Sequence, residues 1–175
     1  KKNIKNFLGK PVIWYSIKAA LKTKIFRKVI VSTNSKDIAS LSLKFGAEVP
    51  FYRSEALSND FADTRSVIAD AINRTKHLYN FTNVCCIYPS NPFVLYTDII
   101  KGLKLLKKKE IKYVFASTSY NHNIYRSFTL DHNFRPKMLF PLKFNKRTQD
   151  IKNTYHDVGQ FYWQKKEDWF IKKNI

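Results

Sequence analysis

The sequence has few cysteines, few acidic residues and no long apolar run. Its two cysteines, Cys85 and Cys86, are adjacent. Neighbours on a strand point to opposite faces, so a disulfide between them would be strained, and we expect buried, reduced thiols in a cytoplasmic protein. No apolar run approaches the ~18 residues that a membrane span needs, and no signal-peptide pattern opens the chain. We therefore expect no membrane partner.

Several motifs of common ligand sites are also missing. The sequence contains neither GxGxxG nor GxxxxGK[ST], so it supports neither a dinucleotide site nor a P-loop. The four histidines are scattered, and no Cys/His cluster has the spacing of metal ligands. A Ser-His-Asp arrangement could be drawn from His156, Asp157 and a distant serine, but this pattern is unspecific.

Acidic residues are scarce, since 13 Asp and Glu stand against 32 Lys and Arg, for a formal charge of +19. Such a charge suits nucleic acid. However, the excess is mostly lysine and is spread over the chain, and only seven residues are arginine, the side chain that reads bases best. We therefore do not expect nucleic acid as the main partner. A basic nucleic-acid-binding domain remains the alternative to an enzyme.

Helical and strand patterns alternate over the first two thirds of the chain. Apolar residues at helical spacing predict helices, and short apolar or β-branched runs between them predict buried strands. The predicted helices are 12–23, 35–45 with Ser35 as cap, 64–79 with Thr64 as cap, and 97–108; the predicted strands are 28–33, 48–52, 84–88 and 113–117. This order predicts an α/β fold with a mainly parallel sheet flanked by helices, and the run at 84–88 is the candidate for its centre.

The pattern changes after Ser119. Two alternating stretches flank DHNF, which predicts a β-hairpin excursion from the main sheet near residues 124–140. The chain then passes through 144–163, and one more helix is predicted from KKEDWFIKKN. Because repeats and linkers are absent, we expect residues 1–175 to form a single domain.

Ligands of open parallel sheets bind beyond the carboxyl ends of the strands. The polar segments expected there are 32–34, the stretch from Arg53, 88–91, 117–119 and the stretch from Arg147. Basic side chains among small hydroxyl residues suit phosphate and carboxylate groups. The segment 144–163 also collects cations, amides and an imidazole, which is typical of a site for a small, acidic, hydroxyl-rich ligand. A basic loop that leads into an amphipathic strand is the alternative interpretation.

Six blocks of sequence resemble a known family. Three early blocks read KKNIKNFLGKPVIWYSI, KVIVSTNSKDIASLSLKFGAEVPFYR and LSNDFADT, and they resemble the cytidylyltransferases that activate nine-carbon 2-keto sugar acids, the CMP-sialic acid synthetase or acylneuraminate cytidylyltransferase family. Three later blocks read CCIYPSNPF, FNKRTQD and YHDVGQFYW, and they are most similar to its pseudaminic acid cytidylyltransferase branch. The resemblance covers essentially the whole chain. It implies a Rossmann-like nucleotide-diphosphosugar transferase fold.

The resemblance also implies a reaction. The anomeric hydroxyl of the sugar acid, here pseudaminic acid, attacks the α-phosphate of CTP, and CMP-sugar and pyrophosphate leave with the assistance of Mg²⁺. The product would serve surface glycan or flagellin glycosylation. Such phosphoryl chemistry needs positioning and charge neutralisation more than covalent participation of the protein.

Two sets of binding residues are implied by the resemblance. The nucleotide-binding set is Lys2, Asn3, Arg53, Thr64, Tyr88 and Ser90, with Lys2 and Asn3 on the phosphates, Thr64 beside the base or ribose, and the Tyr88–Ser90 turn on the cytosine. The sugar-acid-binding set is Arg126, Arg147, Gln149, His156, Asp157, Gln160 and Tyr162. Lys2 and Arg147 are the implied catalytic residues, with Arg147 clamping the carboxylate. For each residue alone, a solvated surface or a satisfied core position is the alternative.

The sequence departs from the family pattern in three places. A glycine-rich basic loop is expected before Lys1, and metal-binding carboxylates are expected beyond Ile175, so the chain resembles a fragment trimmed at both ends. Asn34 stands where the family has aspartate. These departures keep open a non-catalytic paralogue, and the acceptor could instead be legionaminic, sialic or 3-deoxy-octulosonic acid. Relatives dimerise through an excursion comparable to Ile124–Phe140, so we expect a homodimer.

Overall fold

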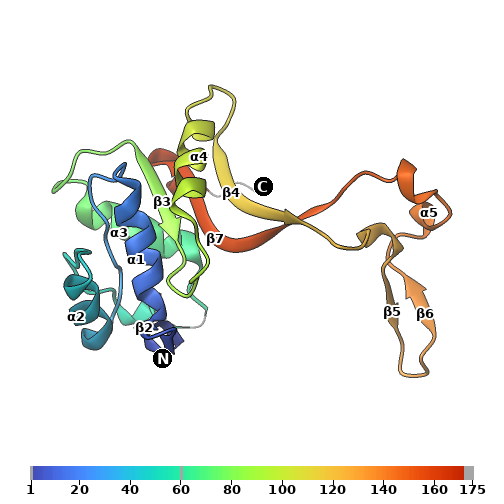
Figure 1. Ribbon diagram of the computed structural model, residues 1–175, viewed down its shortest axis with the longest axis horizontal. Helices are drawn as coiled ribbons and strands as arrows, with labels where there is room; N and C mark the ends of the chain where they lie inside the picture. Colours follow the sequence, from blue (N-terminus) through green and yellow to red (C-terminus); the bar gives the residue numbers. More distant parts are fainter. Residues whose placement is uncertain (1, 60, 172–175) are drawn as a thin grey trace. The chain divides into compact units, whose positions relative to one another are not determined.

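The computed structural model describes residues 2–59 and 61–171 (Figure 1). Two compact units are present: the first combines the chain up to Ala116 with the segment from Gly159 onward, and the second is Ser117–Val158. The single domain stays a prediction, because two compact units can belong to one domain or to two separate domains. Each unit is therefore described by itself.

Four helices of the first unit lie close to their predicted positions. They are α1 (Val12–Thr23), α2 (Lys36–Lys44), α3 (Thr64–Thr75) and α4 (Tyr96–Leu106). On α1, the residues buried at helical spacing include Ile13, Ile17 and Ala20, which confirms the apolar pattern read from the sequence. The cap predicted for α3 is wrong by one residue. Asp63, not Thr64, is the N-cap, and its carboxylate accepts a hydrogen bond from the Ser66 N–H at 2.9 Å.

The largest sheet has three strands in the order β3-β7-β4. Their bounds are β3 (Asn83–Ile87), β4 (Tyr113–Ser119) and β7 (Tyr155–Lys165). Strands β3 and β7 are antiparallel, with Cys85 opposite Trp163. The centre of this sheet is therefore β7, the last strand of the chain, and not the run at 84–88. The reason lies in the tertiary packing, because the part of β7 from Phe161 to Trp163 is apolar and buried on both faces.

The two faces of β7 pack into different clusters. Phe161 and Trp163 pack with Ile99 of α4, while Tyr162 packs with Ile68 of α3. This alternation is the period of two of a β-strand. The Trp163 indole N–H also donates to the Ile99 carbonyl at 3.1 Å, so the ring is fixed as well as buried.

The α/β class is confirmed, whereas the mainly parallel sheet is not. The predicted strands 28–33 and 48–52 form only isolated parallel bridges, Ile30 with Glu48 and Thr33 with Tyr52. The Glu48 N–H donates to the Val29 carbonyl at 2.8 Å. The next donor in that register is Pro50, which has no N–H, so a continuous ladder is interrupted there.

The second unit contains the predicted hairpin. Strands β5 (Phe128–Leu130) and β6 (Pro136–Met138) pair antiparallel, which confirms the hairpin excursion near residues 124–140. Asp131 forms its turn, since one carboxylate oxygen accepts from the Asn133 N–H at 2.8 Å and from the Arg135 N–H at 2.9 Å. The other elements of this unit are η3 (Ile124–Arg126), α5 (Pro141–Phe144) and η4 (Thr148–Asp150).

Short elements complete the description. They are η1 (Lys2–Ile4), β1 (Asn6–Phe7), β2 (Lys10–Pro11), η2 (Glu55–Leu57) and η5 (Glu167–Phe170). The helix predicted from residue 165 is present only as the short 3-10 helix η5, and its last predicted residues lie outside the described part. Within the described residues, no helix has the length and apolarity that crossing a membrane requires.

Candidate active site

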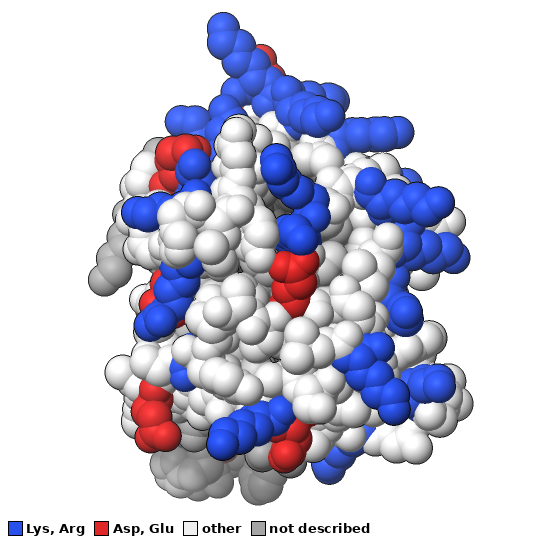
Figure 2. Space-filling model, turned by 90° about the vertical axis from the view of Figure 1, so that its left-hand side faces the viewer, with Lys and Arg blue, Asp and Glu red and all other residues white. Residues whose placement is uncertain are grey.

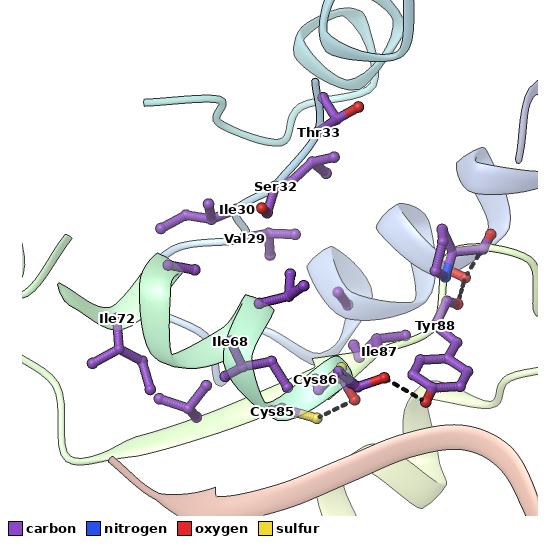
Figure 3. A pocket seen from close by; sticks show the side chains of 18 of the residues that line it. Val29, Ile30, Ser32, Thr33, Ile68, Ile72, Cys85, Cys86, Ile87 and Tyr88 are labelled. Carbon is purple, nitrogen blue, oxygen red and sulfur yellow. Dashed lines mark hydrogen bonds between the residues drawn. The ribbon is translucent and has the colours of Figure 1, made fainter. Parts of the chain in front are cut away.

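A cavity of about 1010 Å³ lies within the first unit. Its lining comes mainly from η1, α1, the segment 27–35, the loop 53–64, α3 and β3, and part of it is drawn in Figure 3. Five of the six predicted nucleotide-binding residues line it, and these are Lys2, Asn3, Arg53, Thr64 and Tyr88. Ser90 is not among the lining residues, whereas Pro89 is. The cavity therefore brings together residues up to 86 positions apart, and their binding roles stay predictions.

Part of the cavity wall is apolar. Figure 3 shows Val29 and Ile30 across the cavity from Cys86 and Ile87, with Ile68 of α3 beside them. This wall does not suit a phosphate or a cytosine edge, because those groups require hydrogen-bond donors and charges. Only the polar part of the lining could therefore interact with such groups.

Arg53 is held at the cavity by its backbone and by its side chain. Its N–H donates to the Thr33 carbonyl at 3.0 Å, and its Nε donates to Ser58 Oγ at 3.1 Å. The second bond orients the planar guanidinium, whose remaining N–H groups match phosphate oxygens in a bidentate way. The segment directly before η2 thus presents an oriented cation to the cavity.

Tyr88 connects three elements at the end of β3. Its hydroxyl and that of Thr64 are 3.1 Å apart and share a hydrogen bond, which links the turn to the first residue of α3. Its backbone N–H donates to the Gln160 carbonyl of β7 at 2.9 Å. Its ring lies 5.3 Å from that of Tyr162, between centroids. The structure therefore brings Thr64, Tyr88, Gln160 and Tyr162 together.

The environment of Tyr162 differs from the predicted one. Its side chain is buried and packs against Ile68, Ile72 and Trp169, so it is a core residue. Burial leaves little of its surface for contact with a sugar acid. A role for Tyr162 in the sugar-acid pocket stays a prediction. The observed packing favours the alternative, in which Tyr162 occupies a satisfied core position.

Two buried polar atoms at the cavity lack a hydrogen-bond partner among the described residues. These atoms are Asn3 Oδ1 and Ser32 Oγ. An unsatisfied buried polar atom costs about 1–3 kcal/mol, so such atoms usually face a ligand, water or further polypeptide. Asn3 belongs to the nucleotide-binding set that the family resemblance implied. Ser32 lies in the segment 32–34, which the sequence predicted at the ligand-binding edge, although Ser32 itself was not placed in either set of binding residues.

The remaining predicted sugar-acid residues belong to the second unit. Arg126 Nη2 donates to the Lys146 carbonyl at 3.0 Å, which ties η3 to the segment that carries Arg147. Arg147 Nε donates to Asp150 Oδ2 at 3.0 Å, and the Arg147 side chain is 75% exposed. An exposed pair of this kind contributes little stability, so its guanidinium can exchange partners for a substrate carboxylate. Gln149 follows Arg147 by two residues in the sequence and is also exposed.

His156 and Asp157 are adjacent on β7 and both are exposed. The His156 ring lies 4.8 Å from the Tyr120 ring, between centroids, and its Nδ1 is 3.0 Å from the Asp157 carbonyl oxygen. That geometry orients the imidazole, although it is not the carboxylate contact of a Ser-His-Asp triad. Because these residues and the cavity belong to different units, a shared pocket stays a prediction.

The two thiols line the cavity, and their reactive thiolate form is disfavoured. Burial raises the pKa of Cys86 to about 12 and raises that of Cys85 well above the ordinary value. Both cysteines are free, which confirms the predicted reduced state. Because the thiolate is the reactive form, neither side chain suits a nucleophile at neutral pH.

The described residues do not fit a Mg²⁺ site by themselves. Among residues 2–59 and 61–171, no group of three or more His, Cys, Asp and Glu side chains could hold a metal ion.

Figure 2 shows Lys and Arg spread over one face of the first unit, with few Asp and Glu between them. The charge is thus diffuse on this face, as the sequence indicated.

The chain is similar in sequence to known proteins. The family model for cytidylyltransferases matches residues 1–172. A pseudaminic acid cytidylyltransferase of Campylobacter jejuni is 36% identical over 171 residues, which cover 97% of this chain and 73% of that protein. An N-acylneuraminate cytidylyltransferase of Escherichia coli is 25% identical over 99% of this chain and 41% of its own length.

A solved structure of similar fold is a CMP:2-keto-3-deoxy-manno-octonic acid synthetase complexed with CTP. It superposes with a TM-score of 0.71 at 13% sequence identity and covers 97% of this chain and 69% of its own. At that identity the likeness concerns the fold alone. Together with the family match over nearly every residue, it leads to one conclusion: this chain belongs to the cytidylyltransferase family.

Proposed function

We propose that the protein transfers CMP from CTP to the anomeric hydroxyl of pseudaminic acid, a nine-carbon 2-keto sugar acid. The observation that carries this proposal is the cavity that collects Lys2, Asn3, Arg53, Thr64 and Tyr88 in a chain of this family. The similarity to the Campylobacter enzyme over 97% of the chain supports the choice of acceptor.

The proposed reaction is an in-line displacement at the α-phosphorus. The anomeric oxygen forms a bond to phosphorus, the bond from phosphorus to the bridging oxygen breaks, pyrophosphate leaves, and the hydroxyl proton passes to solvent. Lys2 and Arg53 neutralise the phosphate charge, which is the main need of such a transition state. Asn3 Oδ1, which is buried without a partner among the described residues, accepts a hydrogen bond from the nucleotide.

The turn at Tyr88 and Ser90 together with Thr64 holds the cytidine. Tyr88 offers an aromatic face, and its hydroxyl is fixed by Thr64 at 3.1 Å. A ring with a fixed edge stacks on a base at low entropic cost. Ser90 follows within the same turn and supplies a hydroxyl for the base edge.

The acceptor is held through its carboxylate and hydroxyls. Arg147 exchanges Asp150 for the substrate carboxylate, because a bidentate bond to a bound ligand is stronger than an exposed ion pair at the surface. The residues proposed for the hydroxyl and acyl groups are Arg126, Gln149, His156, Asp157, Gln160 and Tyr162. Arg126 supports this arrangement through its bond to the Lys146 carbonyl.

Mg²⁺ is proposed as the cofactor. When bound, it would neutralise phosphate charge on CTP. The described residues contain no group of three or more His, Cys, Asp and Glu side chains that could hold it, so the phosphates of CTP would supply part of its coordination. Titration of the full-length protein with EDTA tests the proposal: turnover should be lost and should return with added Mg²⁺, and full turnover in excess EDTA would contradict it.

Three further properties are proposed from the resemblance. The fold of the full protein is Rossmann-like with a mainly parallel sheet, which the two parallel bridges support. The protein is a cytoplasmic homodimer, and the exposed Phe128, Leu130 and Leu142 supply apolar surface for the interface. The CMP-sugar serves surface glycan or flagellin glycosylation. Light scattering that reports a monomer would refute the dimer.

A panel of acceptors tests the function. Full-length protein is incubated with CTP, Mg²⁺ and, separately, pseudaminic, legionaminic, sialic and 3-deoxy-octulosonic acids, and CMP-sugar is quantified. We expect the highest kcat/KM with pseudaminic acid. Higher turnover of another acid would move the proposal to that acceptor, and no turnover of any would refute it. Tight duplex-DNA binding with a steep salt dependence, and none of CTP, would favour a nucleic-acid-binding domain.

A further inference from the structure

Four hydroxyl side chains are buried in the helices of the first unit. They are Ser16 and Thr23 on α1, Ser42 on α2 and Thr75 on α3. In three of them, Thr23, Ser42 and Thr75, the hydroxyl donates to a carbonyl three or four residues earlier in its own helix, at 2.6, 2.6 and 2.7 Å. Such bonds are the usual way in which a buried helical hydroxyl is satisfied. Among these four, Ser16 alone donates to another element.

Ser16 links the middle of α1 to the turn that follows β3. Its hydroxyl donates to the Tyr88 carbonyl at 2.9 Å, and the Pro89 carbonyl oxygen is 3.4 Å from the same Oγ. The partners are 72 residues apart in the chain, and Ser16 is 5% exposed. Because a peptide unit is planar, a bond to its carbonyl fixes the orientation of the whole unit. Ser16 therefore fixes the backbone directly before Ser90.

The same turn is held from β7. The Tyr88 N–H donates to the Gln160 carbonyl at 2.9 Å, and Asn91 Nδ2 donates to the Gly159 carbonyl at 3.0 Å. Figure 3 shows Tyr88 at the end of β3 with hydrogen bonds at its backbone and at its hydroxyl. The turn is thus fixed on one side by a strand pairing and on the other by a single buried serine.

From these contacts we propose that Ser16 is a positioning residue of the nucleotide site, which acts by holding the Tyr88–Asn91 turn. The inference rests on the proposed function, in which this turn contacts cytidine. Without the hydroxyl, the two carbonyls lose their buried donor and the turn rotates to regain one. The Tyr88 ring and the Ser90 hydroxyl then leave the geometry that a base requires.

The test compares two alanine variants of the same helix in full-length protein. Ser16→Ala removes the bond to the turn. Thr23→Ala removes an equally buried hydroxyl that donates within α1, to the Ala20 carbonyl, and accepts from the Ile25 N–H just beyond the helix end at 3.3 Å. Thr23 makes no bond to the Tyr88–Asn91 turn and does not line the cavity, so it is the matched control. Steady-state kinetics with CTP and with the sugar acid are measured for both, together with thermal unfolding. Ser16→Thr, which restores the hydroxyl, is the rescue.

We expect the CTP KM of Ser16→Ala to rise about fivefold to tenfold, the effect of one lost buried hydrogen bond. The sugar-acid KM should rise less than the CTP KM, since in the proposed complex the turn itself contacts the nucleotide and touches the sugar-acid set only through Gln160 and Tyr162. Thr23→Ala should lose a similar amount of thermal stability and keep the CTP KM of the wild type. Ser16→Thr should return the CTP KM toward that of the wild type.

An unchanged CTP KM in Ser16→Ala would overturn the inference, and so would an equal rise in Thr23→Ala, because Ser16 would then act through stability alone. Should Ser16→Ala not fold, Ser16→Cys keeps the volume, weakens the donor and is expected to raise the CTP KM in the same way. Wild-type protein that neither binds nor turns over CTP would refute the proposed function. Wild-type turnover with an indifferent Ser16→Ala would refute only the role of Ser16.

Discussion

Substitution of Arg147 by alanine should separate the two substrates. The Arg147 side chain is 75% exposed and pairs with Asp150 at 3.0 Å, so its loss removes an exposed ion pair whose contribution to stability is about 0.2–1 kcal/mol. The fold should therefore survive, with thermal unfolding within a few degrees of wild type. In the proposed complex, by contrast, the guanidinium forms a charge-assisted, bidentate bond to the carboxylate of the sugar acid.

The expected loss follows from the strength of that bond. Hydrogen bonds to charged groups contribute about 1.5–3 kcal/mol, which corresponds to a rise of roughly 10- to 150-fold in the sugar-acid KM. The CTP KM should change by less than about threefold, because in the proposed complex the Arg147 guanidinium contacts the carboxylate of the sugar acid and not the nucleotide. Steady-state kinetics with each substrate varied at saturation of the other measures both constants.

Arg135→Ala is the matched control. Arg135 is an exposed arginine of the same unit, beside the hairpin turn, and its loss changes the net charge by the same amount. It should leave both KM values near wild type. A sugar-acid KM that is unchanged in Arg147→Ala, or raised equally in Arg135→Ala, would refute the direct contact and leave only a general effect of positive charge.

Three further predictions concern stability and reactivity. Gly102→Val should destabilise the protein by roughly 3 kcal/mol in chemical unfolding, because an added Cβ already lies 2.7 Å from Trp163 Cδ1; wild-type stability would contradict that packing. Cys86 should resist iodoacetamide at pH 7.5 until the protein unfolds, since burial raises its pKa to about 12; rapid labelling of the native protein would disprove this. Glu48→Gln should destabilise the protein at neutral pH, because hydrogen bonds from Lys28 and from Tyr79 lower the pKa of Glu48. The difference in stability should vanish as the pH falls through that lowered pKa, and a difference that does not depend on pH would argue against the contact.

Local signals in the sequence determined most helices. The spacing of apolar residues in 12–23 gives α1 its buried face, and a proline directly before Val12 fixes its start. Adjacent Asp63 and Thr64 are both good caps, so the sequence alone could not separate them. The carboxylate of Asp63 reaches the Ser66 N–H, and that geometry decided the boundary.

The strands depended on contacts between distant parts of the chain. The apolar run at 84–88 can be recognised from its own residues. Its place at the edge of the three-stranded sheet, however, was decided by β7, which pairs with it from almost 80 residues away. The run at 28–33 has the composition of a buried strand. Its pairing with 48–52 stayed fragmentary, because Pro50 cannot donate to the ladder.

By itself, the sequence determined the α/β class, the hairpin and the residue types of a phosphate and carboxylate site, because these follow from local periodicity, turn residues and motifs. Only the tertiary structure decided which of those residues meet. It gathered Lys2, Arg53 and Tyr88 around one cavity, buried Tyr162 in the core, and turned the hydroxyl of Ser16 toward a carbonyl 72 residues away. The physical reason is that a hydrogen bond or a packing contact between distant residues leaves no periodic trace in the chain. It exists only once the elements that carry the two partners have packed together.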